Sequence, residues 1–98
     1  MPTFLYRIEP VRDEMPTAPT EAEHKLVEAH FAYLKSAHEA GMVRYVGRST
    51  ERPWLGIALL EVADKSAADA FLASDPAVAG GAFRGLTQSW TTVFATRP

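Results

Sequence analysis

The stretch 54-WLGIALLEV-62 decides the fold of this chain, because it is the longest apolar run and has the pattern of a strand without a polar face. In such a strand, Leu55 and Leu59 point to one face of the sheet, and Ala58 and Leu60 point to the other. A strand with one face in water would instead alternate apolar and polar residues. We therefore expect both faces of this strand to be covered.

Two helices flank this strand in the sequence. Thr20 and Glu23 form a capping box that predicts the start of the first helix, and Gly41 stands where a left-handed residue would end it. Asp64 is typical of the N-cap of the second helix. Asp75 precedes a proline and is therefore pushed out of the helical region, which ends that helix. The expected helices span residues 21–40 and 65–73.

The expected elements follow the order β-α-β-β-α-β. This order predicts an α+β fold of the ferredoxin-like kind, an antiparallel sheet with two helices on one face. Two helices leave the other face bare, so we expect a second copy of the chain to cover it, giving a homodimer. A chain of 98 residues supplies one core, so we expect a single domain over 1–98. The expected strands are 4–8, 42–47, 54–62 and 86–95, with a short turn or half-helix over 77–85.

The composition argues against several classes of partner. The formal net charge is -2 and the ten Lys and Arg residues are scattered, so we expect no nucleic-acid partner. The chain has no cysteine, which leaves no disulfide framework. The N-terminus has no secretory pattern, and the longest apolar run is too short to cross a bilayer. We expect a cytoplasmic protein with no membrane partner.

His30 is the first residue that can carry chemistry. Leu26, His30 and Leu34 recur at the spacing of an inward stripe on the first helix, so the imidazole should face the sheet. One interpretation is a core histidine bonded to a backbone carbonyl. The other is a general base and acid, whose free nitrogen faces a cavity while a carboxylate holds the other nitrogen.

Asp75 is the best candidate for that carboxylate. It is otherwise explained as a turn residue before proline. In a ferredoxin-like fold, however, the end of the second helix packs beside the first helix, so His30 and Asp75 can meet. A buried aspartate that orients a histidine is the arrangement of the hydrolytic triads.

Two further residues are candidates for contacts with a substrate. Trp90 shares a strand face with Gln88 and Thr92, and this row could line a cavity for a flat ring. The alternative is an aromatic side chain that fills the core or a dimer interface. Ser49 could donate a hydrogen bond to a substrate oxygen, or be an ordinary turn serine.

The sequence has no motif for a metal or a bound cofactor. His24, His30 and His38 lack the i, i+4 pairing of helical metal ligands. No glycine-rich phosphate loop follows a strand, and no G-x-S-x-G elbow is present. We therefore expect cofactor-free chemistry.

The stretches AHFAYLKSAHEAGMVRYVGR and DPAVAGGAF resemble the YCII-related family, and the matching segments cover most of the chain. The resemblance implies a ferredoxin-like subunit that forms a dimeric α+β barrel. It also places His30 and Asp75 on the family's proposed catalytic dyad. One characterised relative is a dehydrochlorinase that acts on a chlorinated hydroxyhydroquinone.

The chain departs from the family pattern at two positions. Arg48 follows Gly47 where the family usually has proline, and Val27 stands where many relatives have an arginine. Arg48, or Arg7 on the first strand, could supply the missing positive charge. The alternative is a solvated surface residue, which is what arginines mostly are.

Three functional hypotheses follow. The first is a cofactor-independent lyase or isomerase of the dehydrochlorinase type, which transfers a proton on a small oxygenated, cyclic or aromatic compound with a His30–Asp75 dyad. The second is a dimeric binding or accessory module in which this pair is structural. The third is a cofactor-free oxygenase, which rests on fold analogy alone.

Overall fold

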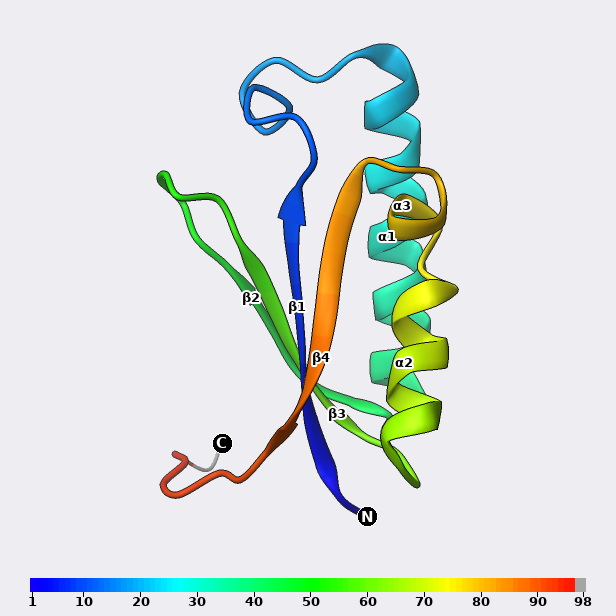
Figure 1. Ribbon diagram of the computed structural model, residues 1–98, viewed down its shortest axis with the longest axis vertical. Coiled ribbons are helices and arrows are strands. Elements are labelled where there is room, and N and C mark those ends of the chain that lie inside the picture. Colours follow the sequence, from blue (N-terminus) through cyan, green and yellow to red (C-terminus); the bar gives the residue numbers. More distant parts are fainter. Residues whose placement is uncertain (97–98) are drawn as a thin grey trace.

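The computed structural model describes residues 1–96 (Figure 1). Four strands and three helices make up this part of the chain. They are β1 (Thr3–Pro10), α1 (Glu21–Glu39), β2 (Val43–Arg48), β3 (Gly56–Glu61), α2 (Lys65–Ala73), α3 (Pro76–Ala79) and β4 (Phe83–Trp90).

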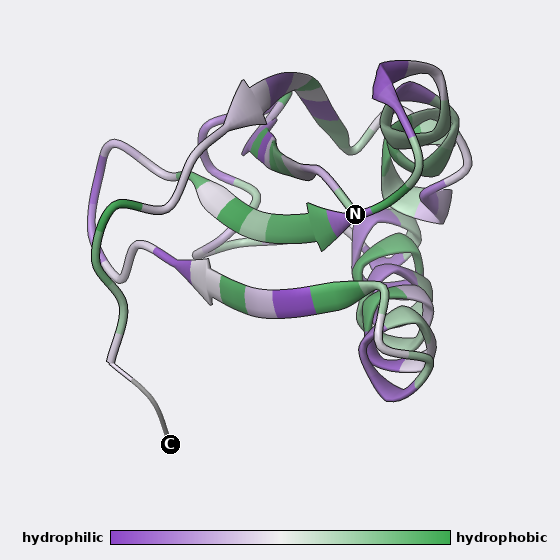
Figure 2. Ribbon diagram, turned by 90° about the horizontal axis from the view of Figure 1, so that it is seen from below, coloured by the Kyte–Doolittle hydropathy of each residue, from purple (hydrophilic) through white to green (hydrophobic). Residues whose placement is uncertain are grey.

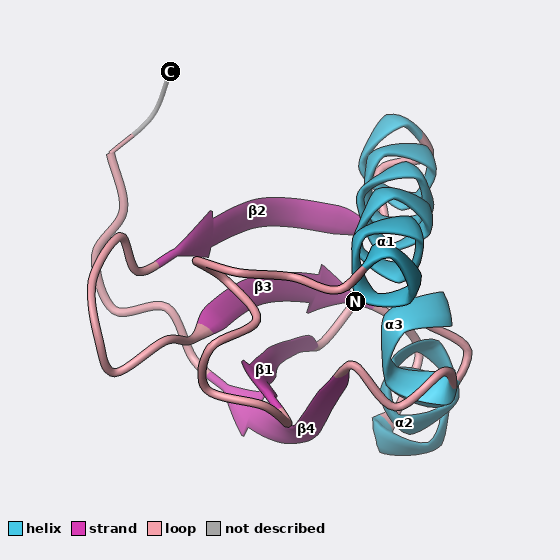
Figure 3. Ribbon diagram, turned by 90° about the horizontal axis from the view of Figure 1, so that it is seen from above, coloured by secondary structure: helices cyan, strands magenta, loops and turns pink. Residues whose placement is uncertain are grey.

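The strands form one antiparallel sheet in the order β2-β3-β1-β4. All three helices lie on the same side of this sheet (Figures 1 and 3). This is the predicted ferredoxin-like α+β arrangement. Within residues 1–96, no helix is both long enough and apolar enough to cross a membrane.

The last strand differs from its prediction. We expected it over 86–95, but β4 begins at Phe83 and ends at Trp90. The reason is the pairing with β1, whose register runs from Pro10 opposite Phe83 to Thr3 opposite Trp90. Strand β4 therefore ends where β1 can offer no further partner, whereas the prediction followed the β-forming residues beyond Trp90.

Helix α1 begins and ends as predicted. The Thr20 hydroxyl accepts from the Glu23 N–H, and the Glu23 carboxylate accepts from the Thr20 N–H. At the other end Gly41 has a φ of +83°, and its N–H donates to the His38 carbonyl. The Met42 N–H donates to the Ala37 carbonyl, which completes a Schellman motif.

The two faces of β3 are both apolar but are covered unequally. Ala58 and Leu60 point toward the helices and are fully buried. Ile57 and Leu59 point to the other face and stay half-buried in the single chain. Figure 2 shows this strand as an almost continuous hydrophobic band. We still predict that a second copy of the chain covers this apolar outer face.

Helix α1 packs closely against the short helix α3 at Gly80. A Cβ atom on Gly80 would lie 2.6 Å from a Leu26 methyl group and 2.9 Å from the Pro76 carbonyl oxygen. The missing side chain therefore sets how near the two helices can come. This approach matters because α1 carries His30 and α3 begins beside Asp75.

We predict that Gly80→Ala lowers the free energy of unfolding by about 1–3 kcal/mol, because the new methyl group forces the helices apart. Urea unfolding followed by circular dichroism measures this. A variant as stable as the parent would show that the contact is not tight.

Candidate active site

Asp75 occupies a fully buried position between α2 and α3. It is the N-cap of α3, where its Oδ1 accepts from the Ala77 N–H at 2.9 Å and Pro76 takes the first helical position. We predicted a helix end here and missed the cap. The Asp-Pro pair followed by AVAGG is a signal that could have revealed it.

The other carboxylate oxygen of Asp75 binds the imidazole. His30 Nδ1 lies 2.7 Å from Asp75 Oδ2, so the predicted contact between the two side chains is present within one chain. His30 is itself only 4% exposed. The pair joins α1 to α3 across 45 residues of sequence.

Tyr6 is a third member of this group. Its hydroxyl donates to the same Oδ2 atom of Asp75, and its side chain is almost completely buried. We did not include Tyr6 among the candidate site residues. The alternation of Phe4, Tyr6 and Ile8 could have placed it on the inner face, but not beside Asp75, which is 69 residues away.

The hydrogen bonds decide the charge state of the group. Burial alone would raise the pKa of Asp75, but the hydrogen bonds from His30 and Tyr6 outweigh it and leave that pKa lowered. Burial, followed by the nearby Asp75 carboxylate, raises the pKa of Tyr6 above its ordinary value. Asp75 is therefore an ionised acceptor at neutral pH, and both Tyr6 and His30 Nδ1 donate to it.

A neutral His30 consequently carries its lone pair on Nε2, on the side away from Asp75. No hydrogen bond from within residues 1–96 reaches Nε2. Within residues 1–96, the one polar side-chain atom that is both fully buried and without a hydrogen-bond partner is Nε1 of Trp54. Nε2 of His30, which also has no partner, is therefore not fully buried. Phe31 and Phe83 pack on the imidazole with centroid distances of 5.3 and 5.1 Å and restrict its rotation.

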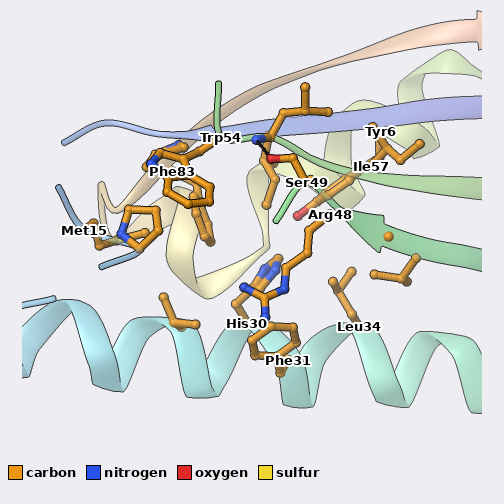
Figure 4. Close-up of a pocket in the computed structure, with 18 of the residues that line it drawn as sticks. Tyr6, Met15, His30, Phe31, Leu34, Arg48, Ser49, Trp54, Ile57 and Phe83 are labelled. Carbon is orange, nitrogen blue, oxygen red and sulfur yellow. Dashed lines mark hydrogen bonds between the residues drawn. The ribbon is translucent and has the colours of Figure 1, made fainter. Parts of the chain in front are cut away.

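His30 lines a cavity of about 450 Å³ between α1 and the sheet (Figure 4). Most of its walls are apolar, with Phe31 and Leu34 from the helix and Ile8, Trp54 and Phe83 from the strands and loops. A volume of this size suits a small ring compound.

Two loops form the rim of this cavity. Residues 11–19 contribute Met15, and residues 49–55 contribute Trp54. The loops are linked by an ion pair between Asp13 and Arg52 with an N–O distance of 2.9 Å. Arg52 also lies over the Trp54 ring, 5.6 Å from its centroid.

Two of the predicted contact residues line the cavity. Arg48 ends β2 on the inner face and points toward the space above α1 (Figure 4). Ser49 also lines the cavity, but its hydroxyl accepts from the Leu55 N–H at 3.0 Å and donates to the Pro53 carbonyl at 3.1 Å. Its side chain thus holds the loop together.

The other two predicted contact residues lie elsewhere. Arg7 and Trp90 stand on the outer face of the sheet, because in each strand they alternate with the inward-facing Tyr6 and Thr87. Trp90 is 43% exposed. Neither residue lines the cavity that contains His30. Within the described part of the chain, no three potential ligands converge as a metal site.

We predict that Asp75→Asn lowers the free energy of unfolding by about 1–3 kcal/mol at neutral pH, because one amide oxygen cannot replace both carboxylate oxygens as acceptors. The lowered pKa of Asp75 makes this contribution pH-dependent. It is fully present above the unfolded value of about 3.9 and is lost as the pH falls through the folded value.

Urea unfolding of both proteins across a pH series measures this effect. The stability difference should shrink below about pH 4, where Asp75 of the unfolded wild type binds a proton while the folded protein, with its lowered pKa, still holds Asp75 ionised. A constant difference across that range would contradict the ionised state of Asp75.

Comparison with known proteins identifies the family of this chain. A family model of the YCII-related domain matches residues 5–87. A solved structure of 5-chloro-2-hydroxyhydroquinone dehydrochlorinase from Burkholderia phenoliruptrix AC1100, in complex with 2,5-dihydroxybenzoquinone, is similar with a TM-score of 0.71. It shares 15% identity and covers 91% of this chain and 93% of its own, so the likeness concerns the fold. No curated protein matches the sequence. The family match spans most of the sequence, and the chain therefore belongs to the YCII-related family.

Proposed function

We propose that this protein is a small-molecule enzyme that transfers protons without a cofactor. The observation that carries this proposal is the state of His30. Its Nδ1 is held by the buried Asp75 carboxylate at 2.7 Å, while its Nε2 has no hydrogen-bond partner within residues 1–96 and faces a cavity of about 450 Å³. A general base needs this combination of a fixed tautomer and an accessible lone pair.

In the proposed reaction, Nε2 accepts a proton from a phenolic or enolic hydroxyl of the substrate. The O–H bond breaks, and its electron pair moves into the ring or the enol. In an elimination, this pair expels a leaving group together with its bonding electrons, and the imidazolium later loses its proton to water. In an isomerisation, the imidazolium returns the proton to carbon. Asp75 stabilises the imidazolium in both cases.

The cavity favours a flat cyclic substrate. Phe31, Trp54 and Phe83 supply aromatic surface around His30. The structurally similar dehydrochlorinase was solved with 2,5-dihydroxybenzoquinone, a small oxygenated ring. This similarity supports an elimination or isomerisation on a compound of that class.

We predict that His30→Ala lowers turnover of a responsive phenolic or enolic compound by about 10²–10⁴-fold, the usual contribution of general acid–base catalysis. A screen of such compounds by absorbance and mass spectrometry would identify the reaction. The matched control is His38→Gln, since His38 lies on the same helix and binds the Val43 carbonyl outside the cavity. The control should retain turnover.

A different outcome would favour the binding module. If a compound binds in the cavity but neither wild type nor His30→Ala converts it, the His30–Asp75 pair is structural. Turnover that is unchanged in a correctly folded His30→Ala protein would also contradict the proposal.

We also propose that the protein is a homodimer. The outer face of the sheet carries half-buried Leu59 and Ile57 together with exposed Tyr45, Leu86 and Trp90, all in the single chain. Sheet-on-sheet contact with a second copy would bury this apolar surface.

We predict a solution mass near twice the chain mass of 10.7 kDa in sedimentation equilibrium. Leu59→Glu should shift the protein toward the monomer, because it places a charge in the centre of the proposed interface. Glu51→Gln, at an exposed loop position, is the control. A wild-type monomer at high concentration would disprove the dimer.

A further inference from the structure

The charges around the cavity are strongly unequal. Apart from the two imidazoles of His24 and His30, Arg48 is the one ionisable basic side chain among the residues that line it. These lining residues include no aspartate and no glutamate. Asp75, behind His30, is ionised, but it does not line the cavity, and its charge is already stabilised by the hydrogen bonds from His30 and Tyr6.

Arg48 differs from most other arginines of the chain in having no acidic partner. Within residues 1–96 it makes no ion pair and no side-chain hydrogen bond, whereas four others pair with a carboxylate. These four are Arg12, Arg44, Arg52 and Arg84. Its five N–H donors are therefore available to a ligand.

The strand register directs this side chain into the cavity. Arg48 pairs with Gly56 at the end of the β2–β3 ladder, on the same face as Val46 and Ala58. Gly56 has no side chain to occupy the space beside it. Figure 4 shows the Arg48 side chain extending toward α1, where His30 and Phe31 project from the helix.

We propose that the substrate is an anion and that Arg48 binds its charged oxygen. This inference rests on the proposed function and adds the charge of the substrate. A guanidinium binds a carboxylate, phenolate or enolate through paired charge-assisted hydrogen bonds, and apolar walls such as Phe31 strengthen that attraction. The ring would lie between Arg48 and the aromatic residues, with Nε2 of His30 facing a second position on it.

In this arrangement Arg48 and His30 have separate roles. Arg48 holds an oxygen that is already ionised and keeps the negative charge localised at that end. His30 then acts on a separate proton, carried by a second hydroxyl or by carbon. Arg48 therefore determines specificity, and neutral analogues of the same shape bind weakly.

The test is a binding measurement that needs no turnover. Trp54 lines the cavity and Trp90 lies on the outer face, so Trp90→Phe leaves one indole as a fluorescent reporter of the cavity. The probes are three pairs of similar shape but different charge: benzoate and benzamide, 2-hydroxybenzoate and 2-hydroxybenzamide, and 4-hydroxybenzoate and 4-hydroxybenzamide. We expect at least one anion to bind about tenfold or more tightly than its amide, with an affinity that falls as salt is added.

The matched pair of variants is Arg48→Gln and Arg44→Gln, made in the reporter protein. Both remove one positive charge from β2, but Arg44 pairs with Glu61 and does not line the cavity. Arg48→Gln should abolish the preference for the anion, and Arg44→Gln should retain it. Arg48→Lys should retain part of it, because an ammonium keeps the charge but not the paired geometry.

Three results would overturn the inference. They are equal binding of anion and amide, an equal loss of preference in both glutamine variants, and no binding of any anion up to its solubility limit. A preference that depends on Arg48, together with turnover indifferent to His30→Ala, would retain the anion site and reject the proposed catalysis. Turnover that is lost in His30→Ala, together with no Arg48-dependent preference for the anion, would reject the anion site and retain the proposed catalysis.

Discussion

The buried carboxylate of Asp75 is the interaction on which the rest of the site depends. A charge removed from water is costly unless hydrogen bonds replace the lost solvent. Here the donors come from β1 through Tyr6, from α1 through His30, and from α3 through the Ala77 N–H. Satisfying one carboxylate therefore joins a strand and two helices, and the same contacts orient the imidazole for chemistry.

The close packing of α1 and α3 explains how Asp75 is kept from water while His30 still reaches a cavity. Gly80 lets the two helices approach, so Asp75 contacts the Nδ1 side of the imidazole, away from the cavity. On the other side of the imidazole, α1 and the sheet separate and leave the cavity of about 450 Å³. The arrangement gives His30 a buried, charged side and an open, mostly apolar side, which is the asymmetry that a proton-transfer residue requires.

Most of the fold was predictable because it depends on local signals. The capping box at Thr20, the left-handed Gly41 and the Asp64 cap each act within a few residues, and each is present as expected. The end of β4 was mispredicted because a strand ends where its neighbour ends, and pairing with β1 is not visible in the local sequence. The same lack of long-range information left Tyr6 out of the site and put Arg7 and Trp90 into it.

The sequence alone determined the order of elements, the inward position of His30 and the residue types able to form a histidine–carboxylate pair, since periodicity and capping are local properties of the chain. Only the tertiary structure decided which side chains share a site. It brought Tyr6 to Asp75 over 69 residues, turned Arg48 toward the cavity, and sent Arg7 and Trp90 to the opposite face of the sheet. The physical reason is that strand register and helix packing set these distances, and both arise from contacts between segments far apart in the chain.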